Sequence, residues 1–301
     1  MLNQGFTYAA TVTNQEHGRD ALGWLSQRFP HSDVATWAAR LAGGQVTSGG
    51  TPITGSSTLQ RGQLVHWARP PWHEPAVPTD FVLVHRDADL LVIDKPHGLP
   101  TMPAGGFLEN TLLAFVRASH PAATPVHRLG RGTSGLVIFA LTERARVGLT
   151  RDLREHRVDK HYVGIIDGVP TWKSLGIEVP IGEVAHARLG TVFGANPSGR
   201  PACSVVNVLP PSAEQPTGGT VMTAPTTRVT VQIYTGRPHQ IRIHLAAVGH
   251  PLAGDPLYGP GGTPRSDALP GDHGYFLHAE RVVLTHPGHG GRLQIVAPPP
   301  F

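Results

Sequence analysis

The chain has 301 residues, of which 40% are hydrophobic and 15% charged, and its formal net charge is +4. This composition is typical of a folded globular protein and excludes a chain that charge keeps disordered. The one cysteine, Cys203, excludes an internal disulfide and a multi-cysteine zinc site. Neither a run of 18 apolar residues nor an N-terminal secretion signal is present, so we expect a cytoplasmic protein without a membrane-spanning segment.

The N-terminal part predicts a flexible arm followed by a small α/β domain. Residues 1–17 show no periodicity, which is typical of a flexible arm. Residues 18–67 predict two short helices with apolar residues at helical spacing, then a hairpin around Gly49-Gly50 and a strand at Gln63–Trp67. This order resembles an S4-type RNA-binding module, and a purely structural small domain is an equal alternative.

A proline-rich segment separates this domain from the rest of the chain. Residues 68–80 contain four prolines, which predicts a linker and a second domain at 81–301. That domain opens with strands at Phe81–Val84 and Leu90–Asp94. Lys95 follows at the end of the second strand, in a turn that Pro and Gly residues fix.

Two further helices lie on either side of the central part of the chain. Asn110 is expected to cap the first helix, which ends before Pro121. Thr142 is expected to cap the second, which runs to His156 with Ala145 and its neighbours at i, i+4, i+8 facing inward. Three arginines lie away from that inward stripe and are expected to face solvent or RNA: Arg144, Arg151 and Arg154.

The central stretch His127–Leu141 combines a polar, glycine-rich loop with an apolar, strand-like run. Its residues 130–135 match the pattern GxGxxG, which binds dinucleotides only when it follows a strand and opens a helix. Here the loop precedes a strand, so we exclude a nucleotide cofactor. The basic excess is concentrated in the same region. Residues 127–161 contain eight Arg or Lys and four acids, a net charge of +4 that equals the net charge of the whole chain. A local excess of positive charge is expected where phosphates bind.

The C-terminal part adds two elements next to polar motifs. Tyr162 lies in a strand that begins near Val158, and Arg228–Tyr234 alternates as a strand does. The second strand leads into Arg237 at a strand-to-helix turn, followed by a helix up to Val248. The intervening segment Gln215–Thr226 is of low complexity and predicts a loop. The histidines of this region lack carboxylate or cysteine partners at metal-ligand spacing, so no metal site is predicted.

Several of these motifs, in this order, resemble those of the RluA-type RNA pseudouridine synthases. His127–Leu136 reads HRLGRGTSGL, against HRLDxxTSGL in the family, and Thr235–Arg242 reads TGRPHQIR, against TGRxHQIR. The turn at Lys95, the Lys-x-Tyr run ending at Tyr162 and the segment from Gly249 to Gly259 also match. Gly130 is the departure, because the family has its catalytic aspartate there.

The resemblance implies an α+β fold, with a mixed, mainly antiparallel sheet and flanking helices behind the S4-like module. It implies conversion of a flipped-out uridine in structured RNA, either rRNA or tRNA, to pseudouridine without cofactor or metal. The implied catalytic positions are Gly130, which is vacant, with Arg237 paired to the aspartate and Tyr162 against the base. The implied RNA-binding residues are His127, Arg128, Arg131, Lys95, His239, Gln240 and Arg242.

Three hypotheses account for Gly130. The chain is an active synthase that uses another carboxylate, such as Asp159 or Asp255. Alternatively, it is a catalytically inactive protein of the same fold that binds RNA as a chaperone or assembly factor. In the third, Gly130 is an engineered or sequencing change of an ordinary enzyme.

Overall fold

The computed structural model describes residues 2–210 and 225–301, and it divides the chain into two units, Met1–Glu74 and Pro75–Phe301. The division falls inside segment 68–80, which the sequence predicts as a linker. Residues 215–224 of the predicted loop Gln215–Thr226 lie outside the described residues.

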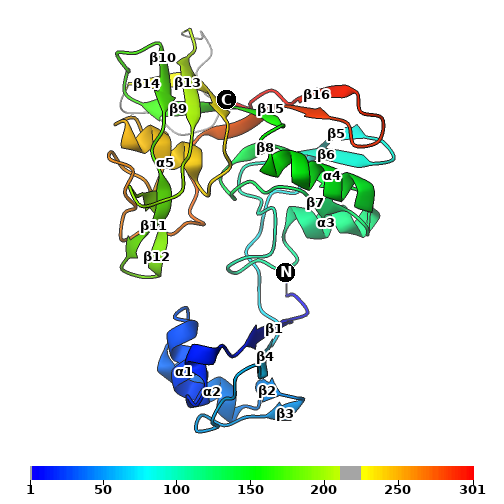
Figure 1. Ribbon diagram of the computed structural model, residues 1–301, viewed down its shortest axis with the longest axis vertical. Coiled ribbons are helices and arrows are strands. Elements are labelled where there is room, and N and C mark those ends of the chain that lie inside the picture. Colours follow the sequence, from blue (N-terminus) through cyan, green and yellow to red (C-terminus); the bar gives the residue numbers. More distant parts are fainter. Residues whose placement is uncertain (1, 211–224) are drawn as a thin grey trace. The chain divides into compact units, whose positions relative to one another are not determined.

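The N-terminal unit contains two helices and a four-stranded sheet in the order β1-β4-β2-β3 (Figure 1). Its elements are β1 (Phe6–Thr11), α1 (Ala21–Arg28), α2 (Val34–Ala42), β2 (Val46–Ser48), β3 (Thr51–Pro52) and β4 (Leu64–Arg69). Asp20 and Asp33 cap the two helices by accepting hydrogen bonds from backbone N–H groups of the first turn. The predicted helices and the hairpin at Gly49-Gly50 are confirmed.

The prediction of a flexible arm at residues 1–17 is wrong. Phe6–Thr11 forms strand β1, which pairs along its whole length with β4 in antiparallel register. The ring of Tyr8 also stacks on Trp67, with 5.2 Å between the ring centroids. The partner strand lies more than fifty residues away in the sequence, so the local pattern of apolar and polar residues did not predict this strand.

The C-terminal unit is built on a ten-stranded sheet whose main path is β10-β13-β14-β9-β15-β8-β6-β5. All its neighbouring strands are antiparallel except β15 and β8, which confirms the predicted mixed, mainly antiparallel sheet. The strands are β5 (Val82–Arg86), β6 (Leu90–Lys95), β7 (Thr124–Pro125), β8 (Ser134–Ala140), β9 (Asp159–Asp167), β10 (Ser174–Ile177), β13 (Ser204–Val208), β14 (Thr226–Ile233), β15 (Leu277–Thr285) and β16 (Arg292–Val296), with β11 (Ile181–His186) and β12 (Gly190–Ala195) as a separate hairpin.

Helices cover both faces of this sheet. Successive residues of β8 show this, because Val137 belongs to the core formed with α3 (Leu112–Ser119) and α5 (Gln240–Ala247), whereas Ile138 belongs to the core formed with α4 (Glu143–Arg154). In Figure 1, α5 lies beside β9, β13 and β14, and α4 lies beside β8.

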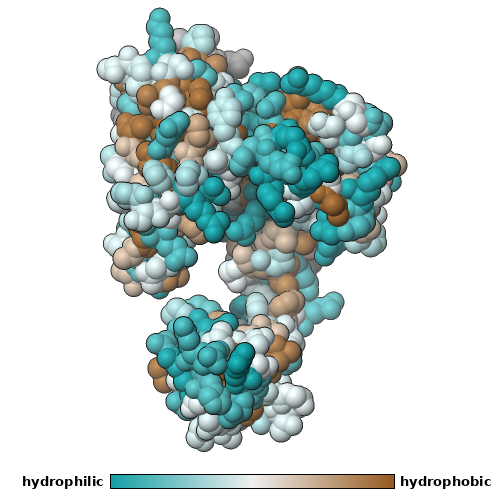
Figure 2. All heavy atoms as spheres, in the orientation of Figure 1, coloured by the Kyte–Doolittle hydropathy of each residue, from teal (hydrophilic) through white to brown (hydrophobic). Residues whose placement is uncertain are grey.

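The outer face of α4 is hydrophilic. Arg144, Arg151 and Arg154 are exposed, as predicted, and Figure 2 shows hydrophilic side chains gathered over this helix. Thr142 caps α4 by accepting a hydrogen bond from the backbone N–H of Ala145, also as predicted. The prediction for the preceding helix is wrong by one residue. Thr111 caps α3, whereas the Asn110 amide donates to the carbonyl of Pro75.

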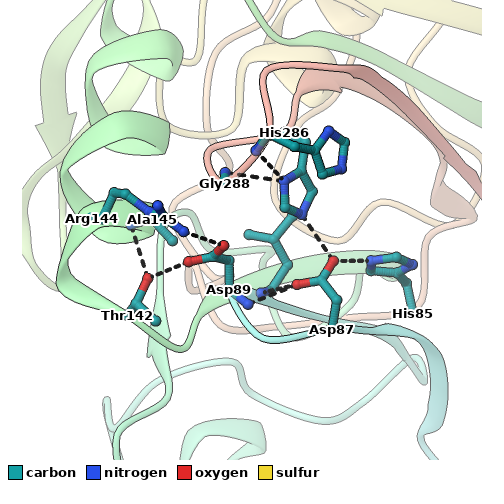
Figure 3. A network of polar contacts seen from close by, with 10 residues as sticks. His85, Asp87, Asp89, Thr142, Arg144, Ala145, His286 and Gly288 are labelled. Carbon is teal, nitrogen blue, oxygen red and sulfur yellow. Dashed lines mark hydrogen bonds and ion pairs between the residues drawn. The ribbon is translucent and has the colours of Figure 1, made fainter.

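A polar network ties the turn between β5 and β6 to two other parts of the unit (Figure 3). The Asp87 carboxylate is hydrogen bonded to His85 at 2.7 Å and to His286, in the turn after β15, at 2.9 Å. The Asp89 carboxylate accepts from Thr142 at 2.7 Å and from Arg144 at 2.8 Å, both at the start of α4. The network thus fixes the strand pair β5–β6, which leads into Lys95.

Gly135, at the start of β8, is expected to be the most sensitive glycine of the sheet. It has φ +107°, and a Cβ there would lie 2.4 Å from the carbonyl oxygen of Ala279. We predict that Gly135→Ala lowers the free energy of unfolding by about 3 kcal/mol, measured by urea denaturation. Gly148→Ala is the control, because its Cβ would lie at an ordinary 3.7 Å from Pro287 inside helix α4. That change should stabilise the protein by about 0.5–1 kcal/mol. Equal effects of the two changes would contradict this packing argument.

Candidate active site

The sheet splits between β8 and β15, and a pocket lies in the split. The two strands pair only at Ser134 and Gly135, opposite His278 and Ala279. Beyond that point, segment 124–127 takes the place beside β8. There, Val126 N–H donates to the Ile138 carbonyl at 3.0 Å, and Ile138 N–H donates to His127 Nε2 at 3.1 Å. The pocket is lined by His127, Leu136, Ile138, Leu153, Val158, Lys160, His161, Tyr162, Ala279, Arg281 and Val282.

Lys160 is a half-buried cation without a counter-charge in this pocket. Its ammonium group makes neither a hydrogen bond nor an ion pair with any residue in the described part of the chain. Burial lowers the pKa of Lys160, because removing the ammonium from water destabilises its charged form. Burial also lowers the pKa of the neighbouring His127 to about 4, with the charge of Lys160 as a second cause. A cation held in this way is suited to an anionic ligand.

Tyr162 forms part of the pocket wall. The residue is 8% exposed, and burial raises the pKa of its hydroxyl to about 12. The phenol is therefore neutral at physiological pH and offers a flat, apolar ring with a hydroxyl at its end.

Next to the pocket, the loop at residues 128–133 packs tightly on Tyr275. A Cβ at Gly132 would lie 2.8 Å from both the Tyr275 ring and His273, so only glycine allows this approach. The hydroxyl of Tyr275 lies 3.1 Å from Thr133 Oγ1, within hydrogen-bond distance. The same hydroxyl lies 3.3 Å from the place that a Cβ of Gly130 would occupy.

Beneath Tyr275 lies a buried ion pair. Arg242 donates two hydrogen bonds of 2.7 Å to the two oxygens of Asp255, and their side chains are 4% and 0% exposed. Burial opposes the charge of Arg242, but the hydrogen bonds to Asp255 outweigh it and raise the pKa of the guanidinium. Its central carbon lies 4.2 Å from the centroid of the Tyr275 ring, in a cation–π contact.

Tyr275 links Arg242 to Gly130, because its ring contacts the Arg242 guanidinium and its hydroxyl lies beside the position of a Cβ at Gly130. Arg237 is half-buried, and its guanidinium donates to the carbonyl of Pro201 at 3.0 Å. Gln240 is buried, and its side-chain oxygen accepts from the backbone N–H of Arg237 at 3.0 Å. Both residues therefore shape the turn before α5.

The predicted RNA-binding residues separate into buried and accessible ones. Lys95 is fully buried, burial lowers its pKa to about 7, and its ammonium donates to the carbonyls of Leu99 at 2.7 Å and Arg131 at 3.4 Å. We therefore assign Lys95 to holding two loops together. The side chains of Gln240 and Arg242 are likewise buried and bonded within the protein.

The accessible members of the predicted set lie around Gly130. Arg128 is exposed, and Arg131 is half-buried, with its guanidinium donating to the Gly271 carbonyl at 3.0 Å. His239 is hydrogen bonded to Tyr258 at 2.8 Å, and burial together with Arg242 lowers its pKa to about 3. His127 and His239 are therefore neutral at physiological pH, and the positive charge comes from the arginines.

Of the two acids considered as replacements for an aspartate at 130, only Asp255 lies at the site. It is saturated, because besides Arg242 its Oδ1 accepts the backbone N–H groups of Leu257 and Tyr258. Asp159 has a side chain 47% exposed and pairs with Arg292 at 3.6 Å. Asp255 is therefore the partner of the buried arginine and has no free oxygen with which to take the role of an aspartate at 130.

Sequence reasoning missed Lys160 and Tyr275. Lys160 belongs to the same Lys-x-Tyr run as Tyr162, so the motif contained that signal. Tyr275 comes from an irregular segment before β15 and matches no pattern that was used. Within the described residues, no group of acids, histidines and cysteine could hold a metal ion. Nor does that part of the chain contain a helix with the length and apolarity needed to cross a membrane.

Comparison with known proteins adds a family to this geometry. The family model described as RNA pseudouridylate synthase matches residues 89–247. An uncharacterized RNA pseudouridine synthase of Synechocystis is 38% identical, over 93% of this chain and 94% of that protein. The dual-specificity RNA pseudouridine synthase RluA of Escherichia coli is 32% identical, over 73% of this chain and 94% of its own. The structure of human RNA pseudouridylate synthase domain containing 1 matches with a TM-score of 0.56 and 25% identity, over 76% of this chain and 87% of that one.

The buried ion pair is expected to dominate the stability of the site. We predict that Asp255→Asn lowers the free energy of unfolding by about 3–5 kcal/mol, because it leaves Arg242 charged and unpaired in the interior. Asp159→Asn, which removes an exposed pair, should cost at most about 1 kcal/mol. Urea denaturation of both variants measures the difference. A loss below about 1 kcal/mol for Asp255→Asn would contradict a buried, charged pair.

The buried histidines should make the C-terminal unit sensitive to acid. Burial lowers the pKa of His127 to about 4 and that of His239 to about 3, from about 6.5 for an exposed histidine. Their neutral forms are favoured in the fold, so their contribution is complete above pH 6.5 and is lost as the pH falls from about 6.5 towards 4. We predict a steep fall of unfolding free energy over this range, and a smaller fall in His127→Gln. His156→Asn is the control, because His156 is exposed, and its slope should equal that of the parent.

Proposed function

We propose that this chain, which belongs to the RluA-type RNA pseudouridine synthases, isomerises a flipped-out uridine of rRNA or tRNA to pseudouridine. The N1–C1′ bond of the nucleotide breaks, the uracil turns, and C5 bonds to C1′ and loses its proton. The base inside a stem cannot enter a pocket while stacked, so the nucleotide must leave the helix. The proposal places the protein in the cytoplasm, where both RNA classes occur.

The observation that carries this proposal is the pocket in the split sheet, with an unpartnered Lys160 beside the buried ring of Tyr162. We assign the tyrosine to the face of the uracil, where its neutral ring can stack. We assign Lys160 to the negative charge of the substrate, which is either a phosphate or the uracil after N1–C1′ cleavage.

We assign the arginine role of the family motif to Arg242 instead of Arg237. Arg242 is the buried guanidinium that contacts Tyr275 beneath Gly130, whereas Arg237 is bonded to a backbone carbonyl at a turn. Arg128 and Arg131, next to Gly130, are assigned to the RNA backbone. A cleft with several cations and few free acids binds a polyanion with a strong dependence on salt.

We also propose that the N-terminal unit is the S4-like RNA-binding module. Its support is the order of two helices followed by a hairpin, together with an aromatic cluster that holds a cation. The guanidinium of Arg40 lies 4.5 Å from the ring centroid of Trp37 and 4.1 Å from that of Trp67. Both rings belong to the buried core of this unit, so the cluster holds the half-buried Arg40 at its edge as a fixed positive charge, which suits a phosphate of RNA.

Gly130 motivates the alternative, an RNA-binding protein without catalysis. Glycine has no side chain to form a covalent bond or exchange a proton. The two functions differ in one measurable quantity, the formation of pseudouridine.

The test uses rRNA and tRNA transcripts made in vitro, which contain no pseudouridine, and maps the modification chemically. We predict that the chain as written modifies a defined uridine. Tyr162→Phe should retain RNA binding and stacking but slow the reaction by about 10²-fold or more, because it removes the hydroxyl that we assign to taking the C5 proton. Tyr234→Phe is the matched control, because Tyr234 is 47% exposed. Binding without modification by the parent chain would reject the enzyme and support the alternative.

Lys160→Met provides a second arm that measures binding by titration at several salt concentrations. Loss of one phosphate contact should lower the slope of log affinity against log salt by about 0.7–0.9. An unchanged slope with a slower reaction would assign Lys160 to the uracil and not to a phosphate.

A further inference from the structure

We infer that the hydroxyl of Tyr275 takes the place of the missing side chain at position 130 and contacts the ribose of the target nucleotide. This inference rests on the proposed function, because it concerns how the same pocket works with Gly130. It assigns a substrate-contacting role to a residue outside every motif of the family resemblance.

The first argument is position. A side chain at residue 130 would start 3.3 Å from Tyr275 Oη and 3.8 Å from Thr133 Oγ1, and no other atom of the described residues beyond the adjacent ones lies within 4 Å. Gly130 itself is exposed. The phenol hydroxyl is therefore the nearest polar group behind this exposed position.

The second argument is that Tyr275 cannot move away easily. Its ring is held between Gly132, which permits an approach of 2.8 Å, and the guanidinium of Arg242 at 4.2 Å. Its hydroxyl is fixed by Thr133 at 3.1 Å. The residue is 3% exposed, so its hydroxyl is fixed in the protein, and a ligand would approach it from the side of the exposed Gly130. Such preorganisation is what a contact in a transition state requires.

The third argument is chemical state. Burial raises the pKa of Tyr275, although Arg242 opposes this, so the phenol keeps its proton at neutral pH. A neutral phenol can donate one hydrogen bond and accept another. Ribose hydroxyls can do the same, so donor and acceptor match on both sides.

The fourth argument is the state of the Asp255 carboxylate. Asp255 is the acid bonded to Arg242, and both of its oxygens are occupied by hydrogen bonds within the protein. With glycine at 130, Arg242 keeps its counter-charge in Asp255, and the polar contact above it falls to Tyr275. Asp255 thus supplies the counter-charge of Arg242, and Tyr275 supplies the polar group beside position 130.

The experiment measures pseudouridine formation under single-turnover conditions on the transcripts described above, for four proteins. These are the parent chain, Tyr275→Phe, Gly130→Asp and the double variant. We expect Tyr275→Phe to slow the parent by about 10²-fold. In the Gly130→Asp background the same change should cost less than about 3-fold, because the new carboxylate supplies the contact.

This difference between backgrounds separates a substrate contact from a structural role, since lost packing would slow both backgrounds equally. Thr133→Val is a second variant, and it should slow the parent less than Tyr275→Phe does, because it removes only the partner of the hydroxyl. Tyr234→Phe controls for loss of an exposed hydroxyl. RNA affinity measured by filter binding should change less than twofold in Tyr275→Phe, Thr133→Val and Tyr234→Phe, because none of these changes alters the charge of the cleft.

The other outcomes reject either the role of Tyr275 alone or the proposed function together with it. If the parent is active and Tyr275→Phe keeps its rate, or loses equally in both backgrounds, the role of Tyr275 is rejected while the proposed function stands. If only Gly130→Asp proteins are active, Tyr275 does not replace the side chain, and the parent is not an active enzyme. If none is active while RNA is bound, both statements fall.

Discussion

The ion pair between Arg242 and Asp255 is the interaction on which the site depends. A guanidinium with almost no exposure is tolerated only when its charge is matched and its donors are used. Asp255 does both with two hydrogen bonds of 2.7 Å, and its own position is fixed by two backbone N–H groups. This pair joins helix α5 to the turn at residues 255–258. The Tyr275 ring, which packs on the Arg242 guanidinium, therefore rests on a rigid support.

Close packing at two glycines holds the loop before β8 and the start of β8 against Tyr275 and β15. Gly132 allows the loop before β8 to lie directly on the Tyr275 ring, and Gly135 allows the start of β8 to lie against Ala279. Side chains at these two positions would push β8 and β15 apart. Because these strands pair only at this point and then separate, the two glycines also determine where the sheet splits and where the pocket begins.

The sequence predicts those elements whose information is local. The helices α1, α2 and α4, the hairpin at Gly49-Gly50 and the strand before Arg237 follow from periodicity and capping residues. Strand β1 was missed because its pairing with β4 is distant in sequence. The motif order placed the polar residues in one region. The motif order could not distinguish Arg237 from Arg242. Arg242 is buried because it pairs with Asp255 and packs on Tyr275, and both of these residues come from later segments of the chain.

Charge explains why glycine at position 130 is compatible with an intact pocket. A carboxylate there would add a negative charge beside the hydroxyl of Tyr275, whose ring contacts a guanidinium that is already paired with Asp255. Without it the pair is neutral as a unit, so the buried part of the site carries no uncompensated charge. The remaining cations, Arg128, Arg131 and Lys160, then lie around a position without an acid. Under the proposed function, a cleft without this carboxylate is more positive and favours a polyanion, and the contact with the ribose is assigned to neutral groups whose positions are fixed by packing.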